Sequence, residues 1–185
     1  MDIVNPIYIQ ILALIAALAS AAAAFFSAFL MPKQLRLMVK QINQSDKQSK
    51  QRSTVDTLLR EKENSFSREI RSKFADLRRV GTDFTKLACE FNNHNKNIGN
   101  GEQEEKIQAD NDVVLTILNN YEFMCLGVKK GVFDEELYCL MNRSNLLRDW
   151  KCLRLYIEKL RDDTEIKTLY CEFEWLAKRW ENEKQ

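Results

Sequence analysis

The N-terminal part of the chain contains a run without charge that is long enough to cross a lipid bilayer. Residues 7–31 hold no Asp, Glu, Lys or Arg, although 30% of all residues are charged. As an α-helix with a rise of ~1.5 Å per residue, this run is about 37 Å long and exceeds the ~30 Å of a hydrocarbon core. It therefore predicts one transmembrane helix and leaves the rest of the 185-residue chain to form one further domain.

A cleaved signal peptide is the main alternative for this run. The letters ASAAAA, residues 19–24, include small residues of the kind that a signal peptidase accepts. However, the residues before the run include Asp2 and no basic residue, and residues 25–31 continue the apolar run past these positions. We therefore expect a retained transmembrane helix.

Basic residues are concentrated directly after the apolar run. Residues 33–52 contain six Lys or Arg and one acidic residue, Asp46, whereas the net charge of the whole chain is only +1. A basic flank stays on the cytoplasmic side of a membrane, so we expect the N-terminus outside and residues 33–185 in the cytoplasm. The chain has five cysteines, an odd number, all beyond the apolar run and without CxxC spacing, and we interpret them as reduced thiols of that cytoplasmic domain.

One face of the predicted membrane helix consists mainly of small and weakly polar residues. At 100° per residue, alternating spacings of three and four place these residues on one face: Gln10, Ala13, Ala17, Ser20, Ala24, Ser27 and Met31. Helices in lipid associate through close backbone approach and polar contacts. We predict that copies of the chain associate along this face and form a ring around a weakly polar pore. The alternative is a chance pattern, since alanine-rich membrane helices are common.

The remainder of the sequence predicts an all-α fold. The chain has only 5 Gly and 2 Pro, and both prolines flank the apolar run. We divide the chain into an outer N-terminus with the transmembrane helix (1–32), a basic juxtamembrane segment (33–54) and a helical bundle (55–185). Residues 43–54 contain no apolar residue and fit either a solvated stalk or a flexible linker.

Apolar spacing predicts the helices of the bundle. Spacings of three, four and seven indicate one helix of about 35 residues from Val55, with Gly81 as a weak point. Four further helices are predicted at 104–130, at 134–141 with Asp134 as its N-cap, at 144–161, and from Thr164. Packed together, these helices form an up-and-down bundle.

The sequence contains no catalytic or metal-binding motif. It has no glycine-rich phosphate loop, and its one histidine leaves a zinc site short of ligands, so we expect no enzyme activity, cofactor or metal. Three polar residues, Asn119, Asn120 and Glu122, lie within an otherwise apolar helix and need partners. We expect a buried polar network rather than a ligand site, with partners among the arginines at positions 148, 154 and 161.

The C-terminal half carries a resemblance to a known family. Residues 113–161, VVLTILNNYEFMCLGVKKGVFDEELYCLMNRSNLLRDWKCLRLYIEKLR, and residues 170–180, YCEFEWLAKRW, contain an Asn-x-x-Glu helix, a Gly-x-x-x-Glu turn and a Trp/Arg helix. In these features and in its layout the chain resembles the membrane accessory proteins of type VI-B CRISPR–Cas loci. The resemblance implies a bacterial inner-membrane protein that assembles with itself, disturbs membrane permeability and enhances antiviral defence by an RNA-guided RNase.

The resemblance also implies a helical domain related to HEPN ribonucleases. Those enzymes use an arginine followed by four to six residues and a histidine, whose imidazole exchanges protons near neutral pH. The best match here begins at Arg154, but Lys159 stands near the expected histidine position. Because an ordinary lysine is protonated at pH 7, we expect a degenerate site in which Arg154 stabilises the fold or an interface.

Three functions therefore remain open at the level of sequence. The preferred hypothesis is a pore-forming membrane effector. Its expected partners are further copies of the chain, membrane lipid and, at the level of function, an RNA-guided RNase. No DNA partner is expected. The second is a membrane scaffold or sensor without conductance. The third is a HEPN-type ribonuclease.

Overall fold

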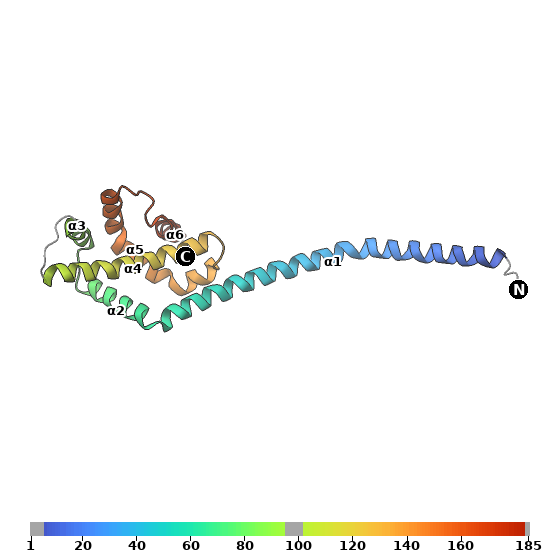
Figure 1. The fold of residues 1–185 in the computed structure, drawn as a ribbon, viewed down its shortest axis with the longest axis horizontal. Helices are drawn as coiled ribbons and strands as arrows, with labels where there is room; N and C mark the ends of the chain where they lie inside the picture. The colour runs from blue at the N-terminus through green and yellow to red at the C-terminus, as the bar shows by residue number, and fades with distance from the viewer. Residues whose placement is uncertain (1–5, 95–101, 184–185) are drawn as a thin grey trace. The chain divides into compact units, whose positions relative to one another are not determined.

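The structure is a computed structural model that describes residues 6–94 and 102–183, and these residues form helices joined by short turns. The helices follow in the order α1 (Pro6–Glu63), α2 (Ser65–Arg79), α3 (Phe84–His94), α4 (Glu102–Lys129), α5 (Glu135–Thr164) and α6 (Cys171–Asn182) (Figure 1). The predicted all-α class is confirmed. Its relation to HEPN domains stays a prediction.

The chain divides into two units, residues 1–48 and residues 49–185, and the division falls within α1. In the first unit α1 continues through Pro32, and every described side chain is exposed. The basic juxtamembrane segment, residues 33–54, is helical throughout, including residues 43–54, for which a solvated stalk or a flexible linker was expected. The part of α1 that belongs to the first unit therefore has no packing partner in that unit among the described residues.

The predicted transmembrane helix is not supported by the described residues. No helix in that part of the chain combines the length and the hydropathy needed to cross a bilayer. The side chains of Ala24 and Ser27 lie outside the described residues, as do several of their apolar neighbours. The crossing at residues 7–31 stays a prediction.

The single helix predicted from Val55 to beyond residue 90 is wrong, because turns divide this segment in two places. The Asn64 side chain accepts hydrogen bonds from the N–H groups of Phe66 and Ser67 (2.9 and 3.3 Å) and begins α2 as an N-cap. Gly81 has a φ of +73°, which a glycine adopts without strain, and it separates α2 from α3. Asparagine favours such caps because its side chain competes with helical hydrogen bonds.

The two helices predicted at 134–141 and 144–161 form one helix, α5. Asp134 is its N-cap, as predicted, and accepts a hydrogen bond of 2.9 Å from the N–H of Leu137. The polar residues 142–144 do not end the helix, because they occupy half-buried or exposed positions on its surface. Thr164 ends α5 instead of starting the last helix, and its hydroxyl donates to the carbonyl of Leu160 (2.7 Å).

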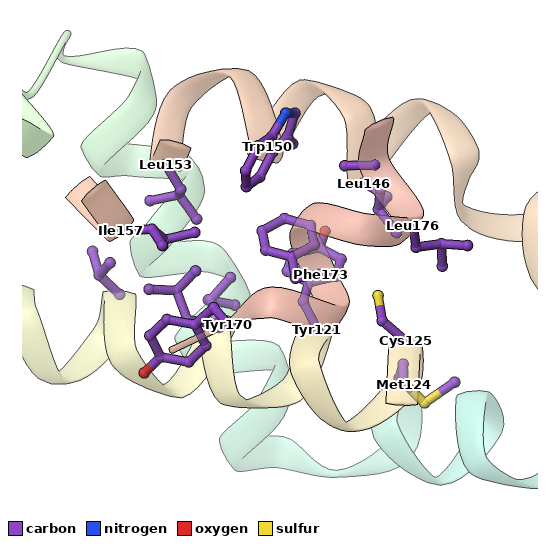
Figure 2. Close-up of a cluster of buried hydrophobic side chains, with 14 of the residues drawn as sticks. Tyr121, Met124, Cys125, Leu146, Trp150, Leu153, Ile157, Tyr170, Phe173 and Leu176 are labelled. Atoms are coloured by element: carbon purple, nitrogen blue, oxygen red, sulfur yellow. The ribbon is translucent and has the colours of Figure 1, made fainter. Parts of the chain in front are cut away.

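The core of the second unit takes side chains from α1, α2 and α3 as well, but most of its buried residues come from α4, α5 and α6. Helix α4 contacts α2, α3 and α6, and α5 contacts α3 and α6. Figure 2 shows the rings of Tyr121, Trp150 and Phe173 gathered at the centre. The rings of Tyr121 and Phe173 are stacked with centroids 4.6 Å apart, and the Trp150 ring meets Phe173 edge-on at 5.4 Å. Aromatic pairs in these geometries add stability beyond the burial of their area.

Candidate functional site

The three polar residues predicted to form a network on α4 are each bonded to another part of the bundle. The Tyr170 hydroxyl donates to Asn119 Oδ1 (3.2 Å), and the Asn120 amide donates to the Glu61 carboxylate. The expected arginine partners are wrong. Arg161 instead bonds to the carbonyl of Leu169 and to Glu174, Arg148 bonds to Asn145 and Asp149, and Arg154 is exposed.

Glu122 caps a helix that is distant in sequence. Its carboxylate accepts hydrogen bonds from the N–H of Glu172 (3.1 and 3.2 Å to its two oxygens) and from the N–H of Phe173 (2.8 Å). The residue at the N-cap position of α6, Tyr170, makes no side-chain cap bond. A negative charge at a helix N-terminus also interacts favourably with the helix dipole. Glu122 therefore fixes the start of α6 against α4.

Replacing Glu122 by glutamine should destabilise the bundle by about 1 kcal/mol, because the cap loses its charge and part of its hydrogen bonding. Urea unfolding of the purified protein measures the change, and amide exchange at Glu172 and Phe173 should accelerate. Glu158→Gln is the control, because Glu158 is exposed on α5. Equal stability of the two variants would contradict this role.

A buried carboxylate at Asp149 was not identified from the sequence. Only 3% of Asp149 is exposed, and its oxygens accept hydrogen bonds from the Tyr121 hydroxyl and from Arg78 Nη1, both at 2.7 Å. Burial and the neighbouring Asp149 raise the pKa of Tyr121, so its hydroxyl keeps its proton and remains a donor. The spacing contained a signal, since Asp149 lies three residues after Leu146 and four before Leu153, on the apolar face of α5.

Two further buried polar residues join helices of the bundle. Asn111 donates to the carbonyl of Ile107 (2.9 Å) and accepts from the Tyr156 hydroxyl (2.7 Å). Thr54, near the end of α1, accepts from the N–H of Asp134 (2.8 Å) and donates to the carbonyl of Lys50 (2.8 Å). Both Asn111 and Thr54 are fully buried. These bonds hold helices in register and leave no buried hydroxyl or amide free at either position.

The degenerate HEPN-like positions do not form an acid–base pair. Arg154 is exposed and makes no hydrogen bond or ion pair with any described residue, so the expected anchoring of the fold is not observed. Lys159 Nζ lies 2.9 Å from Asp163 Oδ1, and this hydrogen bond raises the lysine pKa. A lysine that holds its proton more firmly is a poor general base at neutral pH.

The described residues of the predicted membrane face lie on the exposed surface of α1. Gln10, Ala13, Ala17 and Ser20 are exposed, and the Ser20 hydroxyl donates to the carbonyl of Ala17 (2.9 Å). This bond satisfies the hydroxyl within its own helix. The side chains on this face are small, and the Ser20 hydroxyl needs no partner outside its own helix.

The cysteines and acidic residues do not form a metal centre in the described parts of the chain. No group of three His, Cys, Asp or Glu side chains there could hold a metal ion. All five cysteines are free thiols. Burial raises the pKa of the Cys125 thiol, so this thiol remains protonated and unreactive at neutral pH.

These features define an all-helical protein in which a long N-terminal helix joins a compact bundle. The chain belongs to the family described as "Domain of unknown function (DUF4760)", whose match covers residues 9–180. The match begins within the apolar run and ends in α6, so the family's domain includes residues of both units. No curated protein and no solved structure gives a significant match.

Proposed function

We propose that the protein is a membrane-anchored homo-oligomer whose α1 helices associate within the lipid and form a pore. The observation that carries this proposal is the exposure of large apolar side chains along the start of α1. The described members before the basic segment are Ile7, Tyr8, Ile11, Leu12, Leu14, Ile15, Leu18, Phe25, Phe26 and Met31, each at least 48% exposed. A continuous exposed apolar surface of this kind marks a membrane or assembly site.

Transfer of this surface from water into lipid would be strongly favourable. Full burial of a Leu, Ile or Phe side chain stabilises by about 1.5–3 kcal/mol. The uncharged run of residues 7–31 includes further apolar residues whose side chains the structure does not describe, and the proposed crossing depends on the complete run. At about 37 Å such a helix is long enough to span the bilayer with some tilt.

The segment after the run suits a cytoplasmic membrane surface. Exposed apolar side chains at Leu35, Met38 and Ile42 alternate with the basic residues Lys33 and Arg36. Each Lys or Arg near an anionic leaflet contributes about 1 kcal/mol of attraction. This pattern supports an orientation with the N-terminus outside and the bundle on the cytoplasmic side of a bacterial inner membrane.

The small face of α1 supports association between copies. Alanine at positions 13 and 17 and the internally bonded hydroxyl of Ser20 allow two backbones to approach closely. Gln10 carries an amide that is costly to bury in lipid without a partner, and a second copy supplies one. Because one helix per subunit cannot enclose water, the proposed pore needs a ring of several copies.

The resemblance to membrane accessory proteins of type VI-B CRISPR–Cas loci supports an antiviral role. In this proposal the assembly permeabilises or depolarises the membrane of an infected cell and enhances defence by an RNA-guided RNase. A ribonuclease role receives less support, because Lys159 is paired with Asp163 and replaces the histidine that such an enzyme uses.

Ion flux from vesicles tests the pore directly. Full-length protein reconstituted into vesicles of anionic lipid should release trapped potassium, as measured with an ion electrode. A variant in which leucine replaces residues 11–30 keeps the anchor but removes the small face, and it should release none. Absence of flux from the unaltered protein, or equal flux from both proteins, would contradict the pore; the first result would favour a tether without conductance.

A further inference from the structure

A small cavity in the bundle is surrounded by arginines of two helices. Its volume is about 160 Å³, and it is lined by Arg71, Phe74 and Arg78 of α2 and by Asn145, Arg148 and Asp149 of α5. Since a water molecule occupies about 30 Å³ in the liquid, the cavity has room for a tetrahedral anion together with a few waters. It lies in the second unit and does not depend on insertion of α1 into a membrane.

The charges around the cavity leave one arginine without a full counter-ion. The Glu61 carboxylate pairs with Arg71, and Asp149 pairs with Arg78 at 2.7 Å. Arg148 Nε lies 3.4 Å from the same Asp149 oxygen, and its Nη2 donates to Asn145 Oδ1 at 2.9 Å. One carboxylate thus faces two guanidinium groups, and the side chain of Arg148 is 55% exposed. The lining therefore carries an excess of positive charge.

Arg78, a lining residue of the cavity, carries an unused hydrogen-bond donor. Its side chain is only 18% exposed, and its buried Nε has no hydrogen-bond acceptor among the described residues. A buried donor without an acceptor costs free energy, and such a donor requires an explanation in a folded protein. Because this nitrogen is buried, an anion in the cavity would bond to it only after the Arg78 side chain shifts toward the anion.

We propose that this arginine cavity, lined by Arg71, Arg78, Asn145 and Arg148, binds the phosphoryl group of a small molecule. Guanidinium groups bind phosphate through paired charge-assisted hydrogen bonds, and a tetrahedral group can meet donors from several directions. Phe74 is buried, with the Arg78 guanidinium over its ring at 5.2 Å, so its ring face is not free to stack with a nucleobase. The cavity thus selects the phosphoryl group rather than a base.

Binding at this place would add a second connection between α2 and α5, which the Arg78–Asp149 ion pair already joins. Arg71 and Arg78 belong to α2, whereas Asn145 and Arg148 belong to α5. A ligand that binds the folded bundle and not the unfolded chain stabilises the fold. Phosphate should therefore raise the melting temperature of the protein as well as bind to it.

Isothermal titration calorimetry of the full chain in a nonionic detergent tests the proposal, with inorganic phosphate and AMP as separate ligands at low ionic strength. At least one should bind with millimolar or tighter affinity, and their relative affinity distinguishes free phosphate from a phosphorylated small molecule. Arg148→Gln should weaken binding at least tenfold. Arg154→Gln, an exposed arginine of the same helix, should leave it unchanged.

Circular dichroism and thermal melting accompany each titration. The Arg148→Gln variant should keep its helical spectrum and lose the rise in melting temperature that phosphate produces in the unaltered protein. If Arg148→Gln disturbs the fold, Arg148→Lys replaces it and should also bind more weakly, because lysine lacks the paired donors. Absence of binding to the unaltered protein, equal binding of acetate, or equal loss in the Arg154→Gln control would overturn the proposal.

Discussion

Asp149→Ala is expected to destabilise the bundle by about 3–5 kcal/mol, because removing one partner of a buried ion pair leaves the other charge uncompensated. The carboxylate is 3% exposed and bonds both Arg78 and the Tyr121 hydroxyl. In the variant, the guanidinium of Arg78 and the hydroxyl of Tyr121 would both lose their acceptor. The Tyr121 hydroxyl lies in the packed aromatic core, where replacement water has poor access.

Urea unfolding of the purified chain, followed by circular dichroism, measures this loss. Asp149→Asn should be destabilised less than Asp149→Ala, since an amide oxygen still accepts from Tyr121. Glu158→Ala is the matched control, an acidic residue on the exposed face of the same helix. A loss below about 1 kcal/mol for Asp149→Ala would show that the pair contributes no more than an ion pair in solvent.

Substituting leucine at Ala13, Ala17 and Ser20 together should abolish association of the chain in membranes. Leucine keeps the helix apolar, so the variant still inserts, but its larger side chains prevent close approach of the backbones. Chemical cross-linking in vesicles should change from a ladder of oligomers to a single band. The effect is expected to be complete because all three residues belong to the same exposed face.

The control variant carries the same number of substitutions on the opposite face of the helix. Ile11→Leu, Ile15→Leu and Phe25→Leu together alter the bulky side of the helix, which faces lipid in this account. That variant should cross-link like the unaltered protein. Equal loss of cross-linking in both variants would assign association to something other than the small face.

The all-α class and the position of several helices followed from the sequence. These predictions used the scarcity of glycine and proline, the apolar spacing on α4 and the cap at Asp134. Each of these is a local property of the sequence and does not depend on how the helices pack. The break at Asn64 was missed because the apolar spacing continues across it, and the cap that forms it uses one side chain. The unbroken α5 was missed because polar residues at 142–144 resemble a turn when their exposure on a helix is unknown.

The polar contacts of the bundle could be predicted only in part. Asn119, Asn120 and Glu122 each have a partner, but they do not form the buried network expected from the sequence, because Asn119 is exposed and the other two are half-buried. Their partners lie far along the chain, at Tyr170, Glu61 and the start of α6, and only the packing of helices brings them together. Periodicity places Asp149 on the apolar face of α5, but it does not reveal that Arg78 comes from α2 to meet it.

The mass of the particle in lipid tests the central claim that copies of α1 contact one another inside the bilayer. The full chain, reconstituted into lipid nanodiscs and measured by native mass spectrometry, should give several copies of the 21.7 kDa subunit in one particle. The Ala13, Ala17 and Ser20 triple leucine variant should give one copy per disc. A single copy for the unaltered protein, over a range of protein-to-lipid ratios, would contradict the account, because a single α1 helix cannot enclose a pore.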